Sequence, residues 1–537
     1  MTHGNPGDSL FFARLALQAF LLLAACSHSP ERAVPPPAEP VASERPALVV
    51  MLIVDQLSQE LLDRYDDVFT GGFRRLIDGG RWYLNATHDF AGTVTAPGHA
   101  TLSTGTYPSH NGIVANEWFE NVDGEWVEIS NVGDSTVQIV GHPELEGVSP
   151  HSLERTGLAD WIVAAEPGAK VVSVSPKDRG AVLPAAHARG QVWWFENAVG
   201  RFVTSTYYRD DNSGPVDDFN DRTLTTIAAD SVWTSRVPAT LVGRSDPDTA
   251  DYEGDEAAPA FPHRFAGPGE RTDFWEWFER TPMLDQATLA LARVLVDEED
   301  LGRDSIPDFL GISLSQTDRI GHDFGPLSRE QLDNVLRLDA ELGAFFAFLD
   351  SVAGPGRWVL GLSADHGVLF TGSDLRVGES DTARRWTAAE EAAFEEIQTD
   401  AAAGRTPAEV AAALEELDYV AEAWTHAELT SGAAADSFAE LERRSLFPSR
   451  AREEISRWGV EVRFDPYFLD RELGSGHGTA YWYDRNVPLL FYGPGVAAGR
   501  DSARAATVDF APTLARKLGI PFPDDLDGAP LAGVVGD

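Results

Sequence analysis

A threonine occupies a place in the sequence where a catalytic nucleophile could stand. Thr95 lies in the stretch TVTAPGHATLSTGTYPSHNG (93–112), just before Ala-Pro-Gly-His and at the predicted start of a helix. A threonine hydroxyl is a weak nucleophile, and the stretch contains neither a Gly-x-Ser-x-Gly elbow nor a Cys-His pair. If Thr95 reacts, groups elsewhere in the chain must help to remove its proton.

Candidate metal ligands recur at the ends of predicted strands and in the adjacent loops. They are Asp55, Asp318, His322, Asp365, His366 and His477. A single pair, such as Asp318 and His322 in TDRIGHDFGP, is more typical of a protein surface. Together the six suit two zinc ions, because zinc accepts mixed imidazole and carboxylate ligands and keeps one position open in catalytic sites. Three aspartates and a threonine alkoxide would balance the charge of two Zn²⁺, so we expect zinc and the helix N-terminus to activate Thr95.

Apolar runs of the kind that form buried strands must position these residues. The runs are ALVVMLIVD (47–55), AKVVSVSPKDR (169–179), FLGISLSQTD (309–318), WVLGLSADH (358–366) and VPLLFYGPG (487–495). Such runs are typical of parallel strands buried on both faces, and helical patterns over 286–302 and 333–352 alternate with them. We therefore predict an α/β fold with a doubly wound, mostly parallel sheet flanked by helices. Ligands of such sheets bind beyond the carboxyl ends of the strands, where the aspartates fall.

Two segments interrupt the alternation of strands and helices within the predicted catalytic domain, residues 48–537. The first, near 118–275, is rich in Trp and Tyr; the second, near 376–470, is rich in Ala and Glu and is predicted to be helical. We interpret both as insertions that cap the rim of the active site. The acidic stretch RDDNSGPVDDFND (209–221) lacks the ligand spacing of an EF-hand, so we interpret it as a solvated loop, with calcium binding as the alternative.

The N-terminus carries the pattern of an exported protein. The apolar run LALQAFLLLAAC is too short to span a bilayer as a mature helix and indicates a signal peptide over residues 1–26. Its last four residues resemble a bacterial lipobox, with Cys26 as the lipidated residue; an ordinary signal peptide is the alternative. The Pro/Ala-rich segment 27–47 is interpreted as a tether. We expect the protein at the bacterial cell envelope, in the periplasm or on the outer surface, anchored at Cys26.

Charge restricts the partners of this chain. Lys and Arg total 42 against 85 Asp and Glu, for a formal net charge of −43, so the average surface repels nucleic acids and anionic lipid headgroups. A small anionic substrate stays compatible, because salt screens charge beyond about 8–10 Å and local cations decide binding. Cys26 is the only cysteine, which excludes an intramolecular disulfide. We expect a monomer with small-molecule substrates.

These motifs together resemble the alkaline phosphatase superfamily. The match is to its PafA-type alkaline phosphatases, relatives of the nucleotide pyrophosphatase/phosphodiesterases, and it covers residues 48 to 535. It rests on VDQ, TAPGHATLSTGTYPSHNGIVAN, SPKDRGAVLPA, TDRIGHDFGP, SADHGV, GHGTAYWYDRNVPLLFYGPG and TVDFAPTLARKLGI. The resemblance implies one zinc ion held by Asp318, His322 and His477, and another held by Asp55, Asp365 and His366 with Thr95 as nucleophile. It also implies that the transferred phosphoryl group is contacted by Asn116, Lys177 and Arg179.

The last two residues of that set bear on the substrate. A phosphate monoester has an extra charged oxygen, and Lys177 with Arg179 could clamp it, whereas phosphodiesterase relatives generally lack such a clamp. We therefore predict hydrolysis of phosphate monoesters, with a phosphodiesterase or nucleotide pyrophosphatase as the alternative. A sulfatase is disfavoured because Thr95 cannot be converted to formylglycine. A lipoprotein that only binds phosphorylated ligands or metal is also disfavoured. Such a protein would lack part of the catalytic set, and here every member of the set is present.

Some nearby residues are expected to play supporting parts. His88, His99 and His110 are interpreted as structural or solvent-facing, because six ligands already complete the two metal sites. Three residues that follow His477 could orient it, namely Tyr481, Tyr483 and Asp484.

Overall fold

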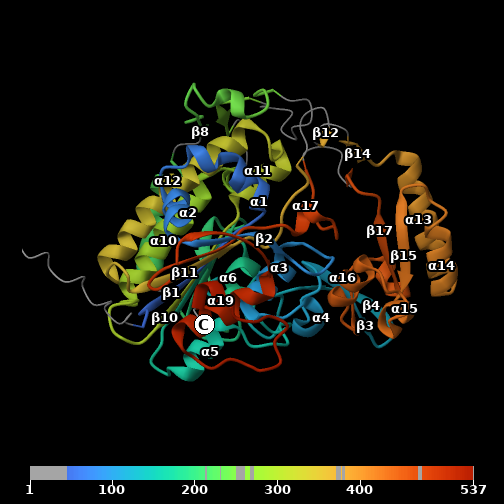
Figure 1. Cartoon of the computed structure of the whole chain (residues 1–537), viewed down its shortest axis with the longest axis horizontal. Coiled ribbons are helices and arrows are strands. Elements are labelled where there is room, and N and C mark those ends of the chain that lie inside the picture. Colours follow the sequence, from blue (N-terminus) through green and yellow to red (C-terminus); the bar gives the residue numbers. More distant parts are fainter. Residues whose placement is uncertain are drawn as a thin grey trace, which may run out of the picture. The chain divides into compact units, whose positions relative to one another are not determined.

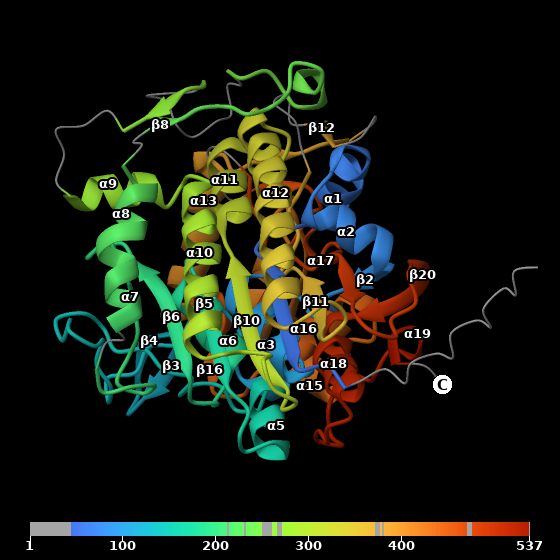
Figure 2. The ribbon, with the colours of Figure 1, turned by 90° about the vertical axis from the view of Figure 1, so that its left-hand side faces the viewer.

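The computed structural model describes residues 45–211, 214–229, 232–249, 260–265, 271–370, 376–377, 381–469 and 475–535. Within these residues nine strands form a central sheet (Figures 1 and 2) in the order β20-β2-β19-β11-β1-β10-β5-β6-β7. In chain order the strands are β1 (Leu48–Val54), β2 (Arg81–Thr87), β5 (Val171–Ser175), β6 (Gln191–Glu196), β7 (Arg201–Val203), β10 (Asp308–Leu314), β11 (Trp358–Ser363), β19 (Leu489–Tyr492) and β20 (Gly499–Ala506).

The sheet is mostly parallel, as predicted. β6, β5, β10, β1 and β11 run parallel to one another, and β2 runs parallel to β20. β19 is antiparallel to both of its neighbours, and β7 is antiparallel to β6. The predicted run at 487–495 therefore forms a strand that points the opposite way from its neighbour β11.

Both faces of the sheet are buried, because successive side chains of a strand point to opposite sides. On β1, Leu48, Val50, Leu52 and Val54 belong to one apolar core, and Val49, Met51 and Ile53 belong to the other. The first core is covered by α1 (Gln59–Tyr65), α2 (Gly72–Gly79), α10 (Met283–Glu298) and α12 (Arg329–Val352). The second is covered by α3 (Thr95–Thr104), α5 (Leu158–Ala165), α6 (Asp178–Ala185) and α18 (Phe510–Leu518). Figure 1 shows the two helical layers with the sheet between them.

The strand directions bring the polar residues of the sequence motifs to one edge of the sheet. Asp55 follows β1, Lys177 follows β5, Asp318 follows β10 and Asp365 follows β11. Since these four strands are adjacent and parallel, their carboxyl ends lie side by side. The antiparallel β19 contributes through the loop before it, which carries His477.

The first predicted insertion is not a single inserted segment. Residues 118–275 include β5, β6 and β7, so part of this stretch belongs to the central sheet. Two of its tryptophans, Trp193 and Trp194, lie on strand β6 and belong to the two cores. The acidic stretch predicted as a solvated loop includes the short helix α7 (Gly214–Asp218), where Asp217 pairs with Arg201.

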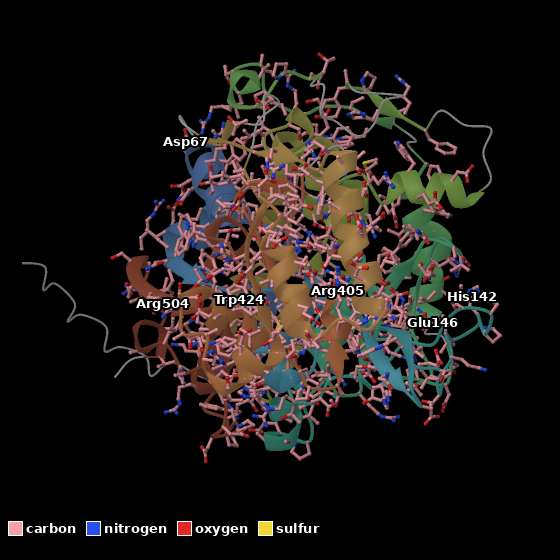
Figure 3. The ribbon with its side chains drawn as sticks, turned by 90° about the vertical axis from the view of Figure 1, so that its right-hand side faces the viewer. Asp67, His142, Glu146, Arg405, Trp424 and Arg504 are labelled. Carbon is pink, nitrogen blue, oxygen red and sulfur yellow. The ribbon has the colours of Figure 1, made fainter. Side chains whose placement is uncertain are left out.

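The second predicted insertion is only partly helical. It contains α13 (Ala388–Ala402), α14 (Pro407–Leu414), α15 (His426–Ser431) and α16 (Ser437–Ser445). It also contains the antiparallel pair β15 (Val420–Thr425) and β17 (Val460–Phe464), whose apolar residues share a small core with α13 and α14. Figure 3 faces this segment, which carries the labelled Arg405 and Trp424.

The N-terminal predictions lie mostly outside the described residues. This applies to the signal peptide, to Cys26 and to residues 27–44 of the tether. Arg45 already contacts the folded chain, because its Nε donates to the carbonyl of Leu518 at 2.7 Å. Across the part of the chain that the structure describes, we find no helix with the length and hydrophobicity needed to cross a membrane.

Candidate active site

Thr95 is the first residue of α3 and lines a cleft. The preceding residue, Val94, has an extended backbone and provides no side-chain cap to the helix. Asn116 supplies one instead, because its Oδ1 accepts a hydrogen bond from the backbone N–H of Ala96 at 2.9 Å. This contact fixes the orientation of the Asn116 amide. Its Nδ2 group can then donate a hydrogen bond to a ligand. The helix N-terminus and this amide together favour an anion beside Thr95.

The first set of predicted ligands converges between β1 and β11. His366 Nε2 lies 3.3 Å from Asp55 Oδ1 and 3.7 Å from Asp365 Oδ2, and all three side chains are fully buried. The Nδ1 atom of His366 contacts the carbonyl oxygen of Gly367 at 3.0 Å, which turns Nε2 toward the carboxylates.

The second set lies at the end of β10, where α11 (Gln316–Phe324) begins. Asp318 Oδ1 is 3.1 Å from His322 Nε2 and 3.5 Å from His477 Nε2, and the two histidine nitrogens are 3.2 Å apart. Backbone carbonyls orient both rings, since Nδ1 of His322 contacts Ser475 and Nδ1 of His477 contacts Thr93. The four-residue spacing of Asp318 and His322 therefore does place both on one face of a helix.

The two sets touch through a pair of stacked histidines. The rings of His366 and His477 lie 3.5 Å apart at 13°. Asp318, His366 and His477 also form a group whose ligand atoms lie within 4.8 Å of one another. The six predicted ligands thus occupy one continuous site, with His366 central to it.

Lys177 is a cation that contacts both sets of predicted ligands. Its Nζ donates to Asp55 Oδ2 at 2.5 Å and to Asp318 Oδ2 at 2.7 Å, and it thereby joins the two sets. Arg179 lies on the first turn of α6 and lines the cleft. Both Lys177 and Arg179 therefore line the cleft, and the Lys177 ammonium also contacts the carboxylates.

The cleft in front of Thr95 has a volume of about 400 Å³. Its walls are formed by Val94, Thr95, Asn116, Lys177, Arg179, Asp318, Arg319, His322 and His477. The predicted nucleophile, the predicted phosphoryl contacts and one complete set of ligands therefore share one cavity.

Burial and mutual charge perturb the ionisation of these groups. Burial raises the pKa of Asp55, and the neighbouring carboxylates raise it further. Burial would also raise the pKa of Asp365, but His366 and His99 hold it below its usual range. Burial lowers the pKa of His477 to about 3, with His366 adding to the effect, so its imidazole is neutral. Neutral imidazole is the form that binds a metal ion.

The donor atoms of the first set fit a bound cation. Among the described residues, Asp55 Oδ1, Asp365 Oδ2 and His366 Nε2 are buried without a hydrogen-bond partner. A buried polar atom left unpaired costs about 1–3 kcal/mol, and here three such atoms face one another. Their mixture of carboxylate oxygen and imidazole nitrogen suits zinc.

Of the other histidines, two are structural as expected. His88 is buried and bonded to the carbonyl of Ala364, and burial lowers its pKa to about 4. His110 contacts Asp527 at 2.8 Å at the surface.

His99 is structural but it also touches the site. Its Nδ1 lies 2.8 Å from the carbonyl of Thr95 and 3.3 Å from Asp365 Oδ2, and its Nε2 lies 2.8 Å from Ser313 Oγ. It therefore connects the nucleophile helix to a ligand of the first set.

Asp484 acts on the loop that carries His477. Its Oδ2 accepts hydrogen bonds from the backbone N–H and the hydroxyl of Thr479 at 2.9 and 2.6 Å. The ring itself is oriented by the carbonyl of Thr93, a contact that the sequence does not reveal.

Sequence reasoning missed Gln56. Its backbone N–H donates to Asp365 Oδ1 at 3.1 Å and its Nε2 donates to Asp318 Oδ1 at 2.8 Å, so it holds one carboxylate of each set. Its φ of 64° is unusual for a residue other than glycine. The only sequence signal was its place directly after Asp55 in VDQ.

Comparison with known proteins gives the family and the relatives of this chain. Residues 49–457 match the family model described as type I phosphodiesterase / nucleotide pyrophosphatase. The chain is 32% identical over 532 residues to alkaline phosphatase PafA of Elizabethkingia meningoseptica, covering 92% of this chain and 95% of that protein. It is 30% identical over 537 residues to alkaline phosphatase PhoV of Synechococcus elongatus, covering 95% and 96%. The crystal structure of wild-type PafA matches with a TM-score of 0.83 and 29% identity, covering 92% of this chain and 100% of that one.

Fold, site and relatives define an enzyme of the phosphatase class, which hydrolyses phosphoesters on an alkaline-phosphatase-like scaffold. The chain belongs to the type I phosphodiesterase / nucleotide pyrophosphatase family, within the alkaline phosphatase superfamily. The resemblance predicted from the motifs is thereby confirmed.

Proposed function

We propose that this protein is a two-zinc alkaline phosphatase that hydrolyses phosphate monoesters through a phosphothreonine intermediate. The observation that carries the proposal is Thr95 at the start of α3, in a cleft that it shares with Arg179, Asn116 and the second ligand set. The names of PafA and PhoV, both alkaline phosphatases, support the same activity.

The predicted ligands would hold two metal ions at the cleft. Asp55, Asp365 and His366 would hold one zinc ion, and Asp318, His322 and His477 the other. When bound, the zinc ions supply Lewis-acid activation of hydroxyl groups and neutralise charge on the substrate and the leaving oxygen.

The reaction then proceeds in two displacements at phosphorus. The Thr95 oxygen attacks in line, the bond from phosphorus to the ester oxygen breaks, and that oxygen leaves with the electron pair and takes up a proton. Water next cleaves the phosphothreonine, which releases phosphate and restores the hydroxyl. Throughout, the Asn116 amide, Lys177 and Arg179 donate hydrogen bonds to the phosphoryl oxygens.

A phosphodiesterase is the second candidate, and one contact favours it. Lys177 already binds Asp55 and Asp318, so it is less available to the extra oxygen of a monoester than the other two cations of the cleft lining, Arg179 and Arg319.

The deciding experiment compares initial rates of the zinc-loaded protein on an aryl phosphate monoester and on the matching diester, with a chelator control. We expect a preference for the monoester that the chelator abolishes. Arg179→Ala should lower monoester turnover by about 100-fold or more while changing diester turnover little. The matched control is the exposed Arg189→Ala, which should keep both rates. A preference for the diester in the unmodified protein would contradict the proposal.

We also propose lipid anchoring at Cys26 and a location at the bacterial cell envelope. Metabolic labelling with palmitate tests this directly. The full-length protein should be labelled and Cys26→Ser should not, whereas label in the variant would contradict the anchor site.

A further inference from the structure

A second cavity, which we term the side pocket, opens beside the Thr95 cleft. Its volume is about 350 Å³, within the roughly 300–1,000 Å³ of small-molecule sites. Residues of the 381–469 segment form one wall, and the loop that carries His477 forms another. Val94 and His477 line both the cleft and the side pocket. These two residues therefore border both cavities, and the side pocket adjoins the cleft in which we propose that the phosphoryl group binds.

Aromatic residues from both walls line this space. Tyr481 and Tyr483 stack with centroids 5.6 Å apart at 24°, and Phe464 and Phe468 stack 5.5 Å apart at 26°. The two walls are joined, because the Tyr481 hydroxyl donates to the carbonyl of Phe464 at 2.7 Å. Large apolar rings held in place in this way favour a planar apolar ligand, since stacked and edge contacts between rings add to the burial of apolar area.

The charges of the side pocket disfavour an anionic ligand. Its charged lining residues are Glu442, Glu453, Asp465, Asp484, Arg452 and Arg463. Arg452 donates to Glu442 at 3.0 Å and to Glu461 at 2.9 Å, and Arg463 donates to Glu422 at 2.7 Å. Both arginines are thus already paired with carboxylates, and the lining has more acidic than basic groups.

We infer that the side pocket receives the leaving group of the substrate, and that it selects an uncharged alcohol or phenol that carries an aromatic ring. The inference rests on the proposed function, because it concerns the part of a phosphate monoester that departs as the alcohol. Substrates whose leaving group bears further phosphates or carboxylates are disfavoured by the same walls.

The test uses monoesters whose alcohols are similar leaving groups. Differences in kcat/KM then report binding of the leaving group and not its intrinsic reactivity. The zinc-loaded protein is given ethyl phosphate, 2-phenylethyl phosphate and the 4-carboxyphenyl analogue of the latter. We expect kcat/KM for 2-phenylethyl phosphate to exceed that for ethyl phosphate about tenfold or more, as burial of a ring predicts. The carboxylated analogue should lose most of this advantage.

Variants of the wall formed by the 381–469 segment locate the effect. Phe464→Ala and Phe468→Ala should each reduce the preference for the phenyl substrate several-fold while ethyl phosphate is still hydrolysed, which also reports that the fold is intact. The matched control is Trp482→Ala, because Trp482 lies next to Tyr483 on α17 (Trp482–Arg485) with 52% of its surface exposed and outside the pocket lining.

The possible results separate the inference from the proposed function. Equal kcat/KM for the ethyl and phenylethyl esters, or a preference that both wall variants retain, would overturn the inference while monoester hydrolysis stands. Failure to hydrolyse any monoester would contradict the proposed function. In that case the side pocket is tested separately, by comparing inhibition by 2-phenylethanol with inhibition by ethanol on whichever phosphoester is hydrolysed. Stronger inhibition by 2-phenylethanol would support the inference. Equal inhibition by the two alcohols overturns the inference.

Discussion

The ammonium of Lys177 lies 2.5 Å from Oδ2 of Asp55, and both side chains are buried. The same ammonium contacts Asp318 at 2.7 Å, so one cation serves a carboxylate from each ligand set. In this arrangement the charge of Lys177 compensates carboxylates that would otherwise repel each other in a site of low polarity.

Replacement of this lysine should destabilise the metal-free protein. Removing one partner of a buried ion pair costs about 3–5 kcal/mol, so Lys177→Met should lower the free energy of unfolding by about that amount in the presence of a chelator. Added Zn²⁺ should narrow the difference, because it neutralises the same carboxylates. Urea denaturation with and without zinc measures both effects. Lys170→Met, near the surface, is the control; a Lys177→Met variant as stable as the unmodified protein without metal would contradict the argument.

Thr95 should be required for the covalent step. Thr95→Ala should lower kcat by about three orders of magnitude or more and abolish phosphorylation of the protein, while Thr95→Ser should keep part of both. Acid quenching with labelled substrate, followed by peptide mapping, measures the intermediate. Thr101→Ala is the matched control, because Thr101 is buried on the same helix. Label that persists in Thr95→Ala would show that another residue is the nucleophile.

Close approach of α3 to the end of β11 predicts that Gly98 is needed. A Cβ atom on Gly98 would lie 2.1 Å from the carbonyl oxygen of Asp365, and that backbone cannot move without displacing a ligand. Gly98→Ala should therefore cost about 1–3 kcal/mol of stability and weaken zinc binding about 10–100-fold. Calorimetric zinc titration and thermal unfolding measure these losses. Gly243→Ala, where a Cβ would meet nothing within 4 Å, is the control; unchanged zinc affinity in Gly98→Ala would refute the role.

The sequence predicts the sheet, and the position of the candidate ligands at its edge, because both depend on local patterns. Unbroken apolar runs end at Asp55 and Asp365, and parallel strands in such folds carry their ligands at the carboxyl ends. The helical spacing of Asp318 and His322 is likewise a local property.

What the sequence does not predict depends on contacts between distant segments. The stacking of His366 on His477 and the contact of Lys177 with two carboxylates require the register of four strands. The true extent of the insertions was also hidden, because strands such as β6 and β17 lie within segments whose composition suggests loops or helices. Gln56 gave no signal beyond its position, since its role rests on an uncommon backbone angle.

A buried charge cluster beside the side pocket makes stability depend on pH. Glu442 and Glu461 are both buried and share Arg452, with Oε2 atoms 3.0 and 2.9 Å from its Nη2. Burial raises the pKa of Glu442 from 4.5 to about 7, and the charge of Glu461 adds to the increase. The folded protein therefore holds a proton on Glu442 that the unfolded chain releases.

The sign of this effect follows from proton linkage. A raised folded-state pKa means that the protonated group stabilises the fold fully below pH 4.5 and that this contribution is lost as the pH rises to about 7. At about 1.4 kcal/mol for each tenfold change in proton affinity, the total is about 3 kcal/mol. Glu442→Gln cannot ionise, so its stability relative to the unmodified protein should increase by about this amount between pH 4.5 and 7 and then level off. Urea unfolding of both proteins across this range measures the difference, and a difference that stays flat would show that Glu442 is charged throughout.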